Sequence, residues 1–466
     1  MRNPRLLALA AGPLLCALVA FMDTPAGLTF AGQRSLAVLA LCVTWWVFTP
    51  VGLPVTSIMG LALLPIMGAM DAADAFSLFG NQAVFFVIGV FLVAAVMMET
   101  GLSARLSLIG LRRFAKDENR LCNGVLLVSW ALCAVVVSHA VAALMLPIVL
   151  ELIRSLNLGP RSRTARRLLL SMAWGTVAGS NLTLLSSARA TLSLELYGGY
   201  LADRAMPADP IGFLEYSMGA LPVSMASVIM AAIVLRWMFP PENLDLGPAV
   251  QKLDQKVSDM GRMSGREWTT LVVIATMIFC VVRFGSEYGL GTVALMFSAI
   301  LFALQTLQWE DAERYVNWGV ALMYGGAIAI GSALHSSGAT SWLITTVMPS
   351  SDINPWVALG TAAVVTAGMT ELVSNSAVIA VVMPVLLPVA EHASLDPRVF
   401  AWSAPISAGL AFVLPTSTPA LAMVFGTGYL RIKHTLPGLL ITLFSLLVFL
   451  AVARWLWPLV GLPVTP

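Results

Sequence analysis

Charged residues are scarce in this sequence of 466 residues, and that scarcity limits what the protein can be. Only 11% of the residues are Asp, Glu, Lys or Arg, 59% are hydrophobic, and the mean hydropathy is +0.88. Soluble domains carry about a quarter charged residues. The composition therefore excludes a soluble domain and indicates an integral membrane protein, with room for around a dozen crossings or part-crossings of about 20 residues. The net charge of +2 is spread over short loops, which excludes a nucleic-acid partner.

Cysteines and enzymatic motifs are also sparse. Five cysteines lie in or beside apolar segments, and their spacing matches no metal site. The chain has no HExxH helix and no paired intramembrane aspartates, which argues against an intramembrane enzyme. We therefore expect no disulfide, no enzymatic activity and no cofactor.

The N-terminal stretch MRNPRLLALAAGPLLCALVAF has two arginines followed by an apolar core, so it resembles both a signal peptide and a transmembrane helix. The apolar run is long, and no small-x-small cleavage site follows it. We predict a first transmembrane helix within residues 1–30, with Arg2 and Arg5 in the cytoplasm.

Most of the remaining apolar sequence divides into spans of ordinary length. Full-length spans are predicted near residues 6–22, 35–50, 53–70, 82–100, 212–238, 268–283, 289–307, 318–335 and 436–457. Two segments do not fit. The segment from Leu121 to Leu150 has 30 residues without a charge, which is about 45 Å of helix. The segment from Pro355 to Ala390 has Glu371 as its only charged residue. Polar residues near the middle of each segment predict a hairpin that enters the membrane, turns and leaves on the same side.

The loop charges agree with these hairpins. Basic residues flank the first long segment on both sides, which predicts that both of its ends are cytoplasmic. The second segment has mainly acidic flanks and is predicted to start and end outside. The rest of the chain then has a cytoplasmic N-terminus, a cytoplasmic linker at 240–267 and an external C-terminus, as a multi-pass protein of the inner, or plasma, membrane.

The two halves resemble each other. GVFLVAAVMMETGLSARL around Gly101 parallels GAIAIGSALHSSGATSWL around Gly338, and the same offset of 237 places Pro147 on Pro384. Five crossings separate equivalent points, so the second copy is predicted to be inverted. The predicted parts are a first helix (1–30), a first repeat (31–239, hairpin 121–156, broken helix 168–201), the linker (240–267), and a second repeat (268–466, hairpin 355–391, broken helix 398–430).

Each hairpin is followed by a membrane segment interrupted by polar residues. AWGTVAGSNLTLLSSARATLSLELYGGY contains Gly179 and Asn181 at its centre, and SAGLAFVLPTSTPALAMVFGTGY contains the run 415–419. An unwound backbone in lipid survives only where it lines a cavity or binds something. Carbonyl, hydroxyl and amide oxygens suit Na+, and half-helix N-termini suit an anion. Small residues also allow close helix packing, but four interruptions paired by a repeat favour a binding site.

The segments TELVSNSAVIAVVMPVLLP and SAGLAFVLPTSTPALAMVFGTGYLRI resemble the second repeat of the divalent anion/sodium symporter family, within the ion transporter superfamily. The resemblance implies an all-α membrane protein with 11 transmembrane helices plus two re-entrant hairpins. It also implies two inverted-topology repeats, elevator-type transport and scaffold parts, and a homodimer in the lipid bilayer. The implied activity is Na+-coupled transport of a small anionic substrate, either a di- or tricarboxylate or sulfate.

The resemblance also suggests site residues. Ser374, Asn375 and Ser376 match the second Ser-Asn-Thr tip, and Thr418 and Pro419 match the start of the loop motif. The predicted substrate-binding residues are Ser138, His139, Asn181, Thr183, Arg189, Ser374, Asn375, Ser376, Thr418 and Pro419. The predicted cation-binding residues are Ser138, Gly179, Ser374, Asn375, Ser376, Thr416 and Thr418, with Na+ near Asn375 and Thr418.

The first repeat departs from the family pattern. Counting back from Pro147 places the first tip on Val137, Ser138 and His139, so the first tip lacks its Asn, and Ala420 and Leu421 replace Pro-Asn in the second loop. Asn181 lies in the first interrupted segment. It is either the Asn of the loop motif there, after a deletion, or a neighbour of that position in an altered loop. A first Na+ site is therefore doubtful. His139 either accepts a proton, which favours H+ coupling or exchange, or caps the hairpin tip by hydrogen bonding.

Two further residues have alternative roles. Arg189 lies about 9 Å beyond the first interruption, where it either binds an anion or extends to the external headgroups. Glu371 is expected to be a structural or gating group hydrogen-bonded within its hairpin. The leading hypothesis is a Na+-coupled secondary transporter of a small anion working by an elevator-like alternating-access mechanism. H+-coupled or exchange-type anion transport, a cation/proton antiporter, a metalloid-anion exporter and a passive channel remain alternatives.

Overall fold

The computed structural model describes residues 4–204, 206, 210–347 and 354–460, and all regular structure among them is helical. Eight helical segments in this part of the chain are long and apolar enough to cross a membrane, and three shorter apolar helices accompany them. The expected all-α membrane fold is therefore confirmed as a class. The protein is a multi-pass membrane protein.

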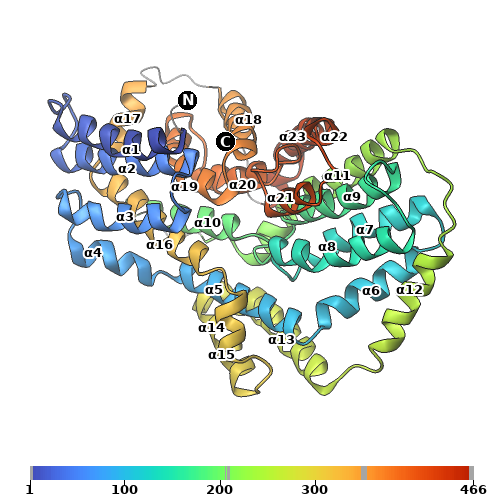
Figure 1. Cartoon of the computed structure of the whole chain (residues 1–466). Helices are drawn as coiled ribbons and strands as arrows, with labels where there is room; N and C mark the ends of the chain where they lie inside the picture. The colour runs from blue at the N-terminus through green and yellow to red at the C-terminus, as the bar shows by residue number, and fades with distance from the viewer. Residues whose placement is uncertain (1–3, 205, 207–209, 348–353, 461–466) are drawn as a thin grey trace.

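The helices follow one another in two groups (Figure 1). The first group is α1 (Pro4–Phe21), α2 (Phe30–Phe48), α3 (Leu53–Ile66), α4 (Ala72–Ser77), η1 (Leu78–Gly80), α5 (Gln82–Glu99), α6 (Leu102–Phe114), α7 (Glu118–Leu132), α8 (Ser138–Ser155), α9 (Arg163–Gly179), α10 (Ala188–Asp203) and α11 (Phe213–Met238). After α12 (Gly247–Asp259), the second group is α13 (Gly265–Tyr288), α14 (Leu290–Ala303), α15 (Trp309–Tyr315), α16 (Trp318–Ser336), α17 (Ala339–Val347), α18 (Pro355–Leu372), α19 (Asn375–His392), α20 (Pro397–Ala408), α21 (Pro419–Gly426), α22 (Ile432–Thr435), α23 (Gly438–Trp455) and η2 (Trp457–Val460).

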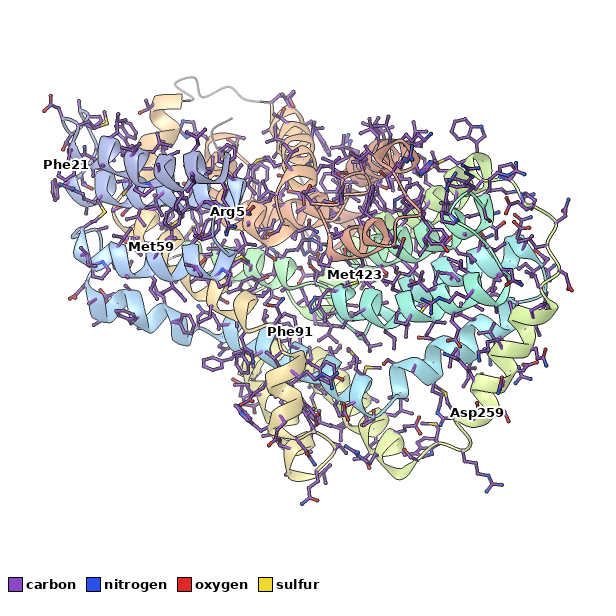
Figure 2. All side chains as sticks on the ribbon, viewed as in Figure 1. Arg5, Phe21, Met59, Phe91, Asp259 and Met423 are labelled. Atoms are coloured by element: carbon purple, nitrogen blue, oxygen red, sulfur yellow. The ribbon has the colours of Figure 1, made fainter. Side chains whose placement is uncertain are left out.

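The outer helices present large apolar side chains on the surface. Leu14 of α1 and Leu447 of α23 are each 67% exposed, and Phe21 lies at the edge of the molecule (Figure 2). Exposed leucines on this scale are unfavourable in water, because each leaves apolar area hydrated. A lipid environment removes that cost, so these surfaces fit a bilayer.

Each of the two long apolar segments, 121–150 and 355–390, forms two helices. The first segment is α7 and α8, joined through residues 133–137, and the second is α18 and α19, joined through Val373 and Ser374. The first segment begins three residues before the predicted start at 121, because the Asp117 carboxylate accepts the backbone N–H of Arg120 (2.9 Å) and caps α7. Neither segment is a single unbroken helix.

The two interrupted segments are also each two helices. In the first, α9 ends at Gly179 and α10 begins at Ala188. In the second, α20 ends at Ala408 and α21 begins at Pro419. α9 begins before the predicted 168, at Arg163, because the Ser162 hydroxyl accepts the N–H of Ala165 (3.2 Å) and caps the helix. The non-helical stretches lie among the buried helices of the molecule.

Close backbone contacts hold these parts together. The Cα of Gly175 in α9 lies against the carbonyl of Leu126 in α7, where a β-carbon would overlap the oxygen. Trp174 donates its indole N–H to the carbonyl of Phe412, next to the second interruption (2.9 Å). The two interrupted segments, more than 200 residues apart in the sequence, are therefore directly joined.

The linker at 240–267 contains a helix and is held against the rest of the protein by ion pairs. Residues Gly247–Asp259 of the linker form α12, and Asp254 of this helix pairs with Arg112 of α6 (2.6 Å). Lys252 and Lys256 pair with Glu151 of α8. At the end of the linker, Glu267 pairs with the buried Arg105 (2.6 Å). The charges of the linker thus dock it against α6 and α8.

Glu242, at the start of the linker, caps α9. Its carboxylate accepts the Ser162 hydroxyl (2.6 Å) and the backbone N–H groups of Arg163 (3.0 Å) and Thr164 (3.2 Å). Burial by itself would raise the pKa of this carboxyl, but these hydrogen bonds lower the pKa to about 2. The charged form is thus preferred in the folded protein.

We predict a pH-dependent contribution of Glu242 to stability. The folded pKa of about 2 lies below the unfolded value of about 4.3, so the contribution is present above the unfolded pKa and is lost as pH falls through the folded pKa. Glu242→Gln is expected to lower the melting temperature of the detergent-solubilised protein near neutral pH, with a difference that shrinks toward pH 2. The exposed Asp259→Asn is the control. A pH-independent difference would contradict the prediction.

Candidate functional site

One cavity of about 650 Å³ gathers residues from both hairpin tips and both interrupted segments. Ser138 and His139 come from the first tip, and Ser374, Asn375 and Ser376 from the second. Phe91 of α5 and Met423 of α21 add apolar walls, and both lie in the middle of the molecule (Figure 2). Distant parts of the sequence meet here, so this cavity is the candidate site.

Four helix N-termini line this cavity. The first residues of α8, α10, α19 and α21 are Ser138, Ala188, Asn375 and Pro419, and all four contribute to its wall. A helix N-terminus presents unpaired N–H groups and about half a positive charge. Four such ends around one cavity favour an anion inside it.

The first tip is bonded to the first interruption. The backbone N–H of Ser138 donates to the carbonyl of Ser186 (3.0 Å), and the Thr183 hydroxyl donates to the carbonyl of Ala134 (3.0 Å). These bonds pair backbone groups that no helix satisfies, which is what a non-helical stretch buried in a membrane protein requires. The tip and the interruption therefore form one unit.

The second tip is bonded to the second interruption through Glu371. Its carboxylate accepts the backbone N–H groups of Phe412 (2.9 Å), Val413 (3.1 Å) and Leu414 (2.8 Å). The Thr416 hydroxyl donates to the Glu371 carbonyl (2.9 Å). The expectation that the Glu371 side chain bonds within its own hairpin was wrong. Its carboxylate oxygens instead accept from three consecutive backbone N–H groups that follow the end of α20 and have no helical partner.

The structure sorts the predicted site residues into two groups. The residues that line the cavity are Ser138, His139, Arg189, Ser374, Asn375, Ser376, Thr418 and Pro419. The residues that do not line it are Gly179, Asn181, Thr183 and Thr416. Gly179 packs on the Trp130 carbonyl, and Asn181 is fully buried with its amide donating to the Ile406 carbonyl (3.3 Å).

Two of the alternatives for these residues are wrong. Arg189 does not extend to the headgroups, because it is 1% exposed and donates to the Pro405 carbonyl (2.8 Å). His139 does not cap the hairpin tip, because α8 begins at Ser138 and the imidazole packs edge-on against Phe91, with ring centroids 5.3 Å apart. Within the described residues, the His139 ring has no hydrogen-bond partner.

Sequence reasoning missed several residues at this site. Tyr324 of α16 lies within hydrogen-bond distance of Ser376 (3.4 Å between oxygens), and Ser187 and Tyr315 line the cavity. Ser187 precedes α10 just as Thr418 precedes α21, and this equivalence was the one signal in the sequence that points to it. Tyr324 had no such signal, because only tertiary packing brings α16 to the second tip.

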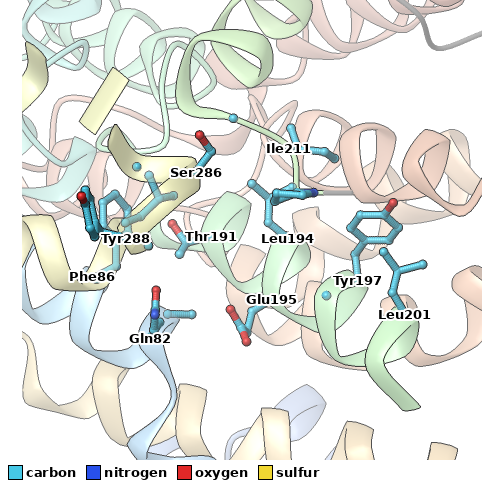
Figure 3. Close-up of a pocket in the computed structure, with 18 of the residues that line it drawn as sticks. Gln82, Phe86, Thr191, Leu194, Glu195, Tyr197, Leu201, Ile211, Ser286 and Tyr288 are labelled. Atoms are coloured by element: carbon cyan, nitrogen blue, oxygen red, sulfur yellow. The ribbon is translucent and has the colours of Figure 1, made fainter. Parts of the chain in front are cut away.

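A second cavity, of about 440 Å³, lies between α10, α5 and α14 (Figure 3). Its wall includes Gln82, Thr191 and Glu195, and Glu195 accepts a hydrogen bond from Asn81 at the start of α5 (2.5 Å). No residue of either hairpin tip lines it. It is therefore separate from the candidate site.

The sequence matches a known family over almost its whole length. Residues 4–462 match the family described as the sodium:sulfate symporter transmembrane region. The chain belongs to this family. It is thus a transporter and not an enzyme, and the resemblance to divalent anion/sodium symporters is confirmed.

Individual relatives are similar at low identity but over full length. The sodium-dependent dicarboxylate transporter SdcS of Staphylococcus saprophyticus is 25% identical, over 99% of this chain and 93% of that protein. SdcS of Staphylococcus aureus is 24% identical, over 98% and 92%. Among solved structures, the Alcanivorax borkumensis YdaH transporter aligns with a TM-score of 0.55 and 13% identity over both complete chains. Neisseria gonorrhoeae MtrF aligns with a TM-score of 0.54 and 14% identity over 97% and 94%. These structures share the fold.

Proposed function

We propose that this protein is a secondary transporter that couples the movement of a small dianion to that of Na+, and that the preferred dianion is a dicarboxylate. The observation that carries the proposal is the meeting of four helix N-termini and two polar hairpin tips at one cavity. Four N-termini supply about two positive charges, which matches a dianion. The two SdcS relatives are named as sodium-dependent dicarboxylate transporters, which supports the same substrate class.

The second tip is the proposed Na+ site. Ser374, Asn375 and Thr418 carry hydroxyl and amide oxygens, and all three line the cavity. Na+ is a hard cation that prefers such neutral oxygen ligands, together with carbonyl groups of unwound helices. A bound Na+ beside the cavity strengthens anion binding through charge attraction, which is the physical basis of coupling.

The proposed motion is of elevator type. The moving part comprises the hairpins, the interrupted helices, α11 and α23, and the scaffold comprises the remaining membrane helices and pairs with a second copy in a homodimer. On the topology predicted from loop charges, Leu53, Arg314 and Asn317 lie at cytoplasmic helix ends and line the cavity, so this state opens inward. At the opposite side, Asn81 bonds to Glu195 (2.5 Å) and His335 to Arg204 (2.6 Å) across the boundary between the two parts.

Uptake by reconstituted protein tests the function. Labelled succinate, citrate and sulfate are offered to proteoliposomes under an inward Na+ gradient, a proton gradient or with internal counter-substrate. We expect succinate to accumulate roughly tenfold faster with the Na+ gradient than with K+ in its place. Protein-free liposomes are the control.

Each other outcome supports a different mechanism. Uptake driven by the proton gradient and indifferent to Na+ would identify H+ coupling and refute the proposed ion. Uptake that requires internal counter-substrate would identify an exchanger. Equilibration without accumulation under every gradient would identify a channel.

A further inference from the structure

Arg189 is a buried cation without an anionic partner. It is the second residue of α10, is 1% exposed, and no ion pair in the described part of the chain includes it. Its partners are neutral oxygen atoms: the carbonyls of Pro405 and Ser180, the hydroxyls of Ser180 and Ser187, and the amide oxygen of Asn181. A buried guanidinium is costly unless its surroundings are arranged for positive charge.

The surroundings supply that arrangement through two helix C-termini. Ser180 is the C-terminal cap of α9, and its carbonyl accepts from Nη2 of Arg189 (3.0 Å). Pro405 lies in the last turn of α20, and its carbonyl accepts from Nε (2.8 Å). Each helix C-terminus carries about half a negative charge and unpaired carbonyl groups. The negative ends of the two interrupted helices thus converge on one guanidinium.

The backbone is shaped to admit this guanidinium. Gly409 is the C-terminal cap of α20, and a β-carbon on it would overlap Nη2 of Arg189 and the amide of Asn181. Asn181 in turn accepts from Nη2 (2.5 Å) and donates to the Ile406 carbonyl (3.3 Å). Arg189 therefore occupies a built site that contains several carbonyl and hydroxyl oxygens, the ligand types that suit Na+.

The second interruption has no such internal cation. The position equivalent to Arg189, the second residue of α21, is Ala420. Residues 369–378 and 409–420 contain no Lys, Arg or His, while Ser374, Asn375 and Thr418 line the cavity. The two halves thus differ in charge: the first contains a permanent cation and the second offers oxygen ligands alone.

We propose that the Arg189 guanidinium is a tethered cation that fills the place of a mobile coupling ion in the first repeat. Only the second tip then binds a mobile Na+, and one Na+ is bound per substrate. This inference rests on the proposed Na+-coupled function. It explains why the first tip functions with Ser138 in place of Asn, since no Na+ has to be held there.

The first test counts the sodium ions. Initial succinate uptake by wild-type proteoliposomes is measured against external Na+ concentration, and the thermal stability of the purified protein is measured against Na+ without substrate. We expect a Hill coefficient of about 1 in both measurements. A coefficient near 2 would overturn the tethered-cation proposal and leave Na+ coupling intact. Absence of any Na+ effect in both measurements would refute the proposed function itself.

The second test removes and restores the cation. Arg189→Ala is expected to lower uptake by about 100-fold and to lower the melting temperature, and added guanidinium ion is expected to restore both in part. Arg189→Lys keeps the charge and is expected to stay folded with a Hill coefficient of about 1. The exposed Arg283→Ala is the control. Its uptake and melting temperature should equal those of the wild type and should not change when guanidinium ion is added. Wild-type uptake and stability in Arg189→Ala would overturn the proposal.

A third variant displaces the guanidinium without removing any charge. Gly409→Ala places a methyl group where Nη2 lies, and we expect uptake to fall about tenfold with guanidinium giving no rescue, since Arg189 is still present. Unchanged uptake and melting temperature in Gly409→Ala would show that the close fit has no role. If Arg189→Ala fails to fold, Arg189→Lys and Gly409→Ala still test the proposal.

Discussion

Replacing Asn375 with alanine is expected to abolish Na+-driven uptake while leaving the protein folded. Asn375 is the first residue of α19, lines the cavity, and accepts a hydrogen bond from the Thr370 hydroxyl (2.6 Å). The substitution removes an amide oxygen from the proposed Na+ site and an amide N–H from the proposed substrate site. The loss of about 3 kcal/mol of interaction corresponds to roughly 100-fold slower uptake.

The fold should survive this change for a specific reason. The Ala408 carbonyl lies 2.9 Å from the Thr370 hydroxyl oxygen, so this hydroxyl can donate there instead when Asn375 is truncated. Asn354→Ala is the matched control: it removes the cap of α18 at an exposed position, and should lower the melting temperature while uptake stays within about twofold. Initial rates and melting curves are measured for both variants. Near wild-type uptake by Asn375→Ala would refute the role of the second tip.

Glu371→Ala is expected to destabilise the protein and to stop transport. The carboxylate satisfies the three consecutive N–H groups of Phe412, Val413 and Leu414, and its removal leaves them without this partner. Hydrogen bonds to a charged group are stronger than neutral ones, so we expect a loss of about 3 kcal/mol or more. Because these N–H groups precede the cavity residues 417–420, the geometry of the second interruption should be lost with them.

Glu371→Gln separates charge from shape. Glutamine keeps one carbonyl oxygen but turns an NH2 group toward backbone N–H donors, so an intermediate melting temperature is expected. The exposed Glu287→Gln is the control and should melt as the wild type does. Melting curves and uptake rates of Glu371→Gln equal to wild type would show that Glu371 does not hold the interruption.

Much of the architecture was predictable because a bilayer leaves few solutions for backbone polar groups. Ser374 and Asn375 in a long apolar run marked the place where α18 ends and α19 begins, and the run from Pro415 to Pro419 marked the gap before α21. The predicted ends were less accurate. Local capping by Asp117 and Ser162 starts α7 and α9 earlier than hydropathy suggested.

The partners of the polar residues were less predictable. The sequence placed Glu371 and Asn181 within membrane segments and left the depth of Arg189 open, but each of the three bonds to a residue 41 to 225 positions away: Phe412, Ile406 and Pro405. Glu371 was expected to bond within its hairpin and instead bonds to the second interruption. Thr416 lies in the polar run 415–419 and donates to the Glu371 carbonyl, outside the cavity. Hydrogen bonds over such separations leave no local pattern in a sequence.

By itself, the sequence determined that this is a helical membrane protein of the symporter family with four interruptions of its apolar segments. Hydropathy and loop charge act locally along the chain, so a single sequence is enough to show them. Tertiary structure alone decided that two helix C-termini meet at Arg189 and that four N-termini meet at one cavity. The partial charge at a helix end acts on the groups that lie just beyond that end. Which groups lie there is decided only when distant helices pack against one another.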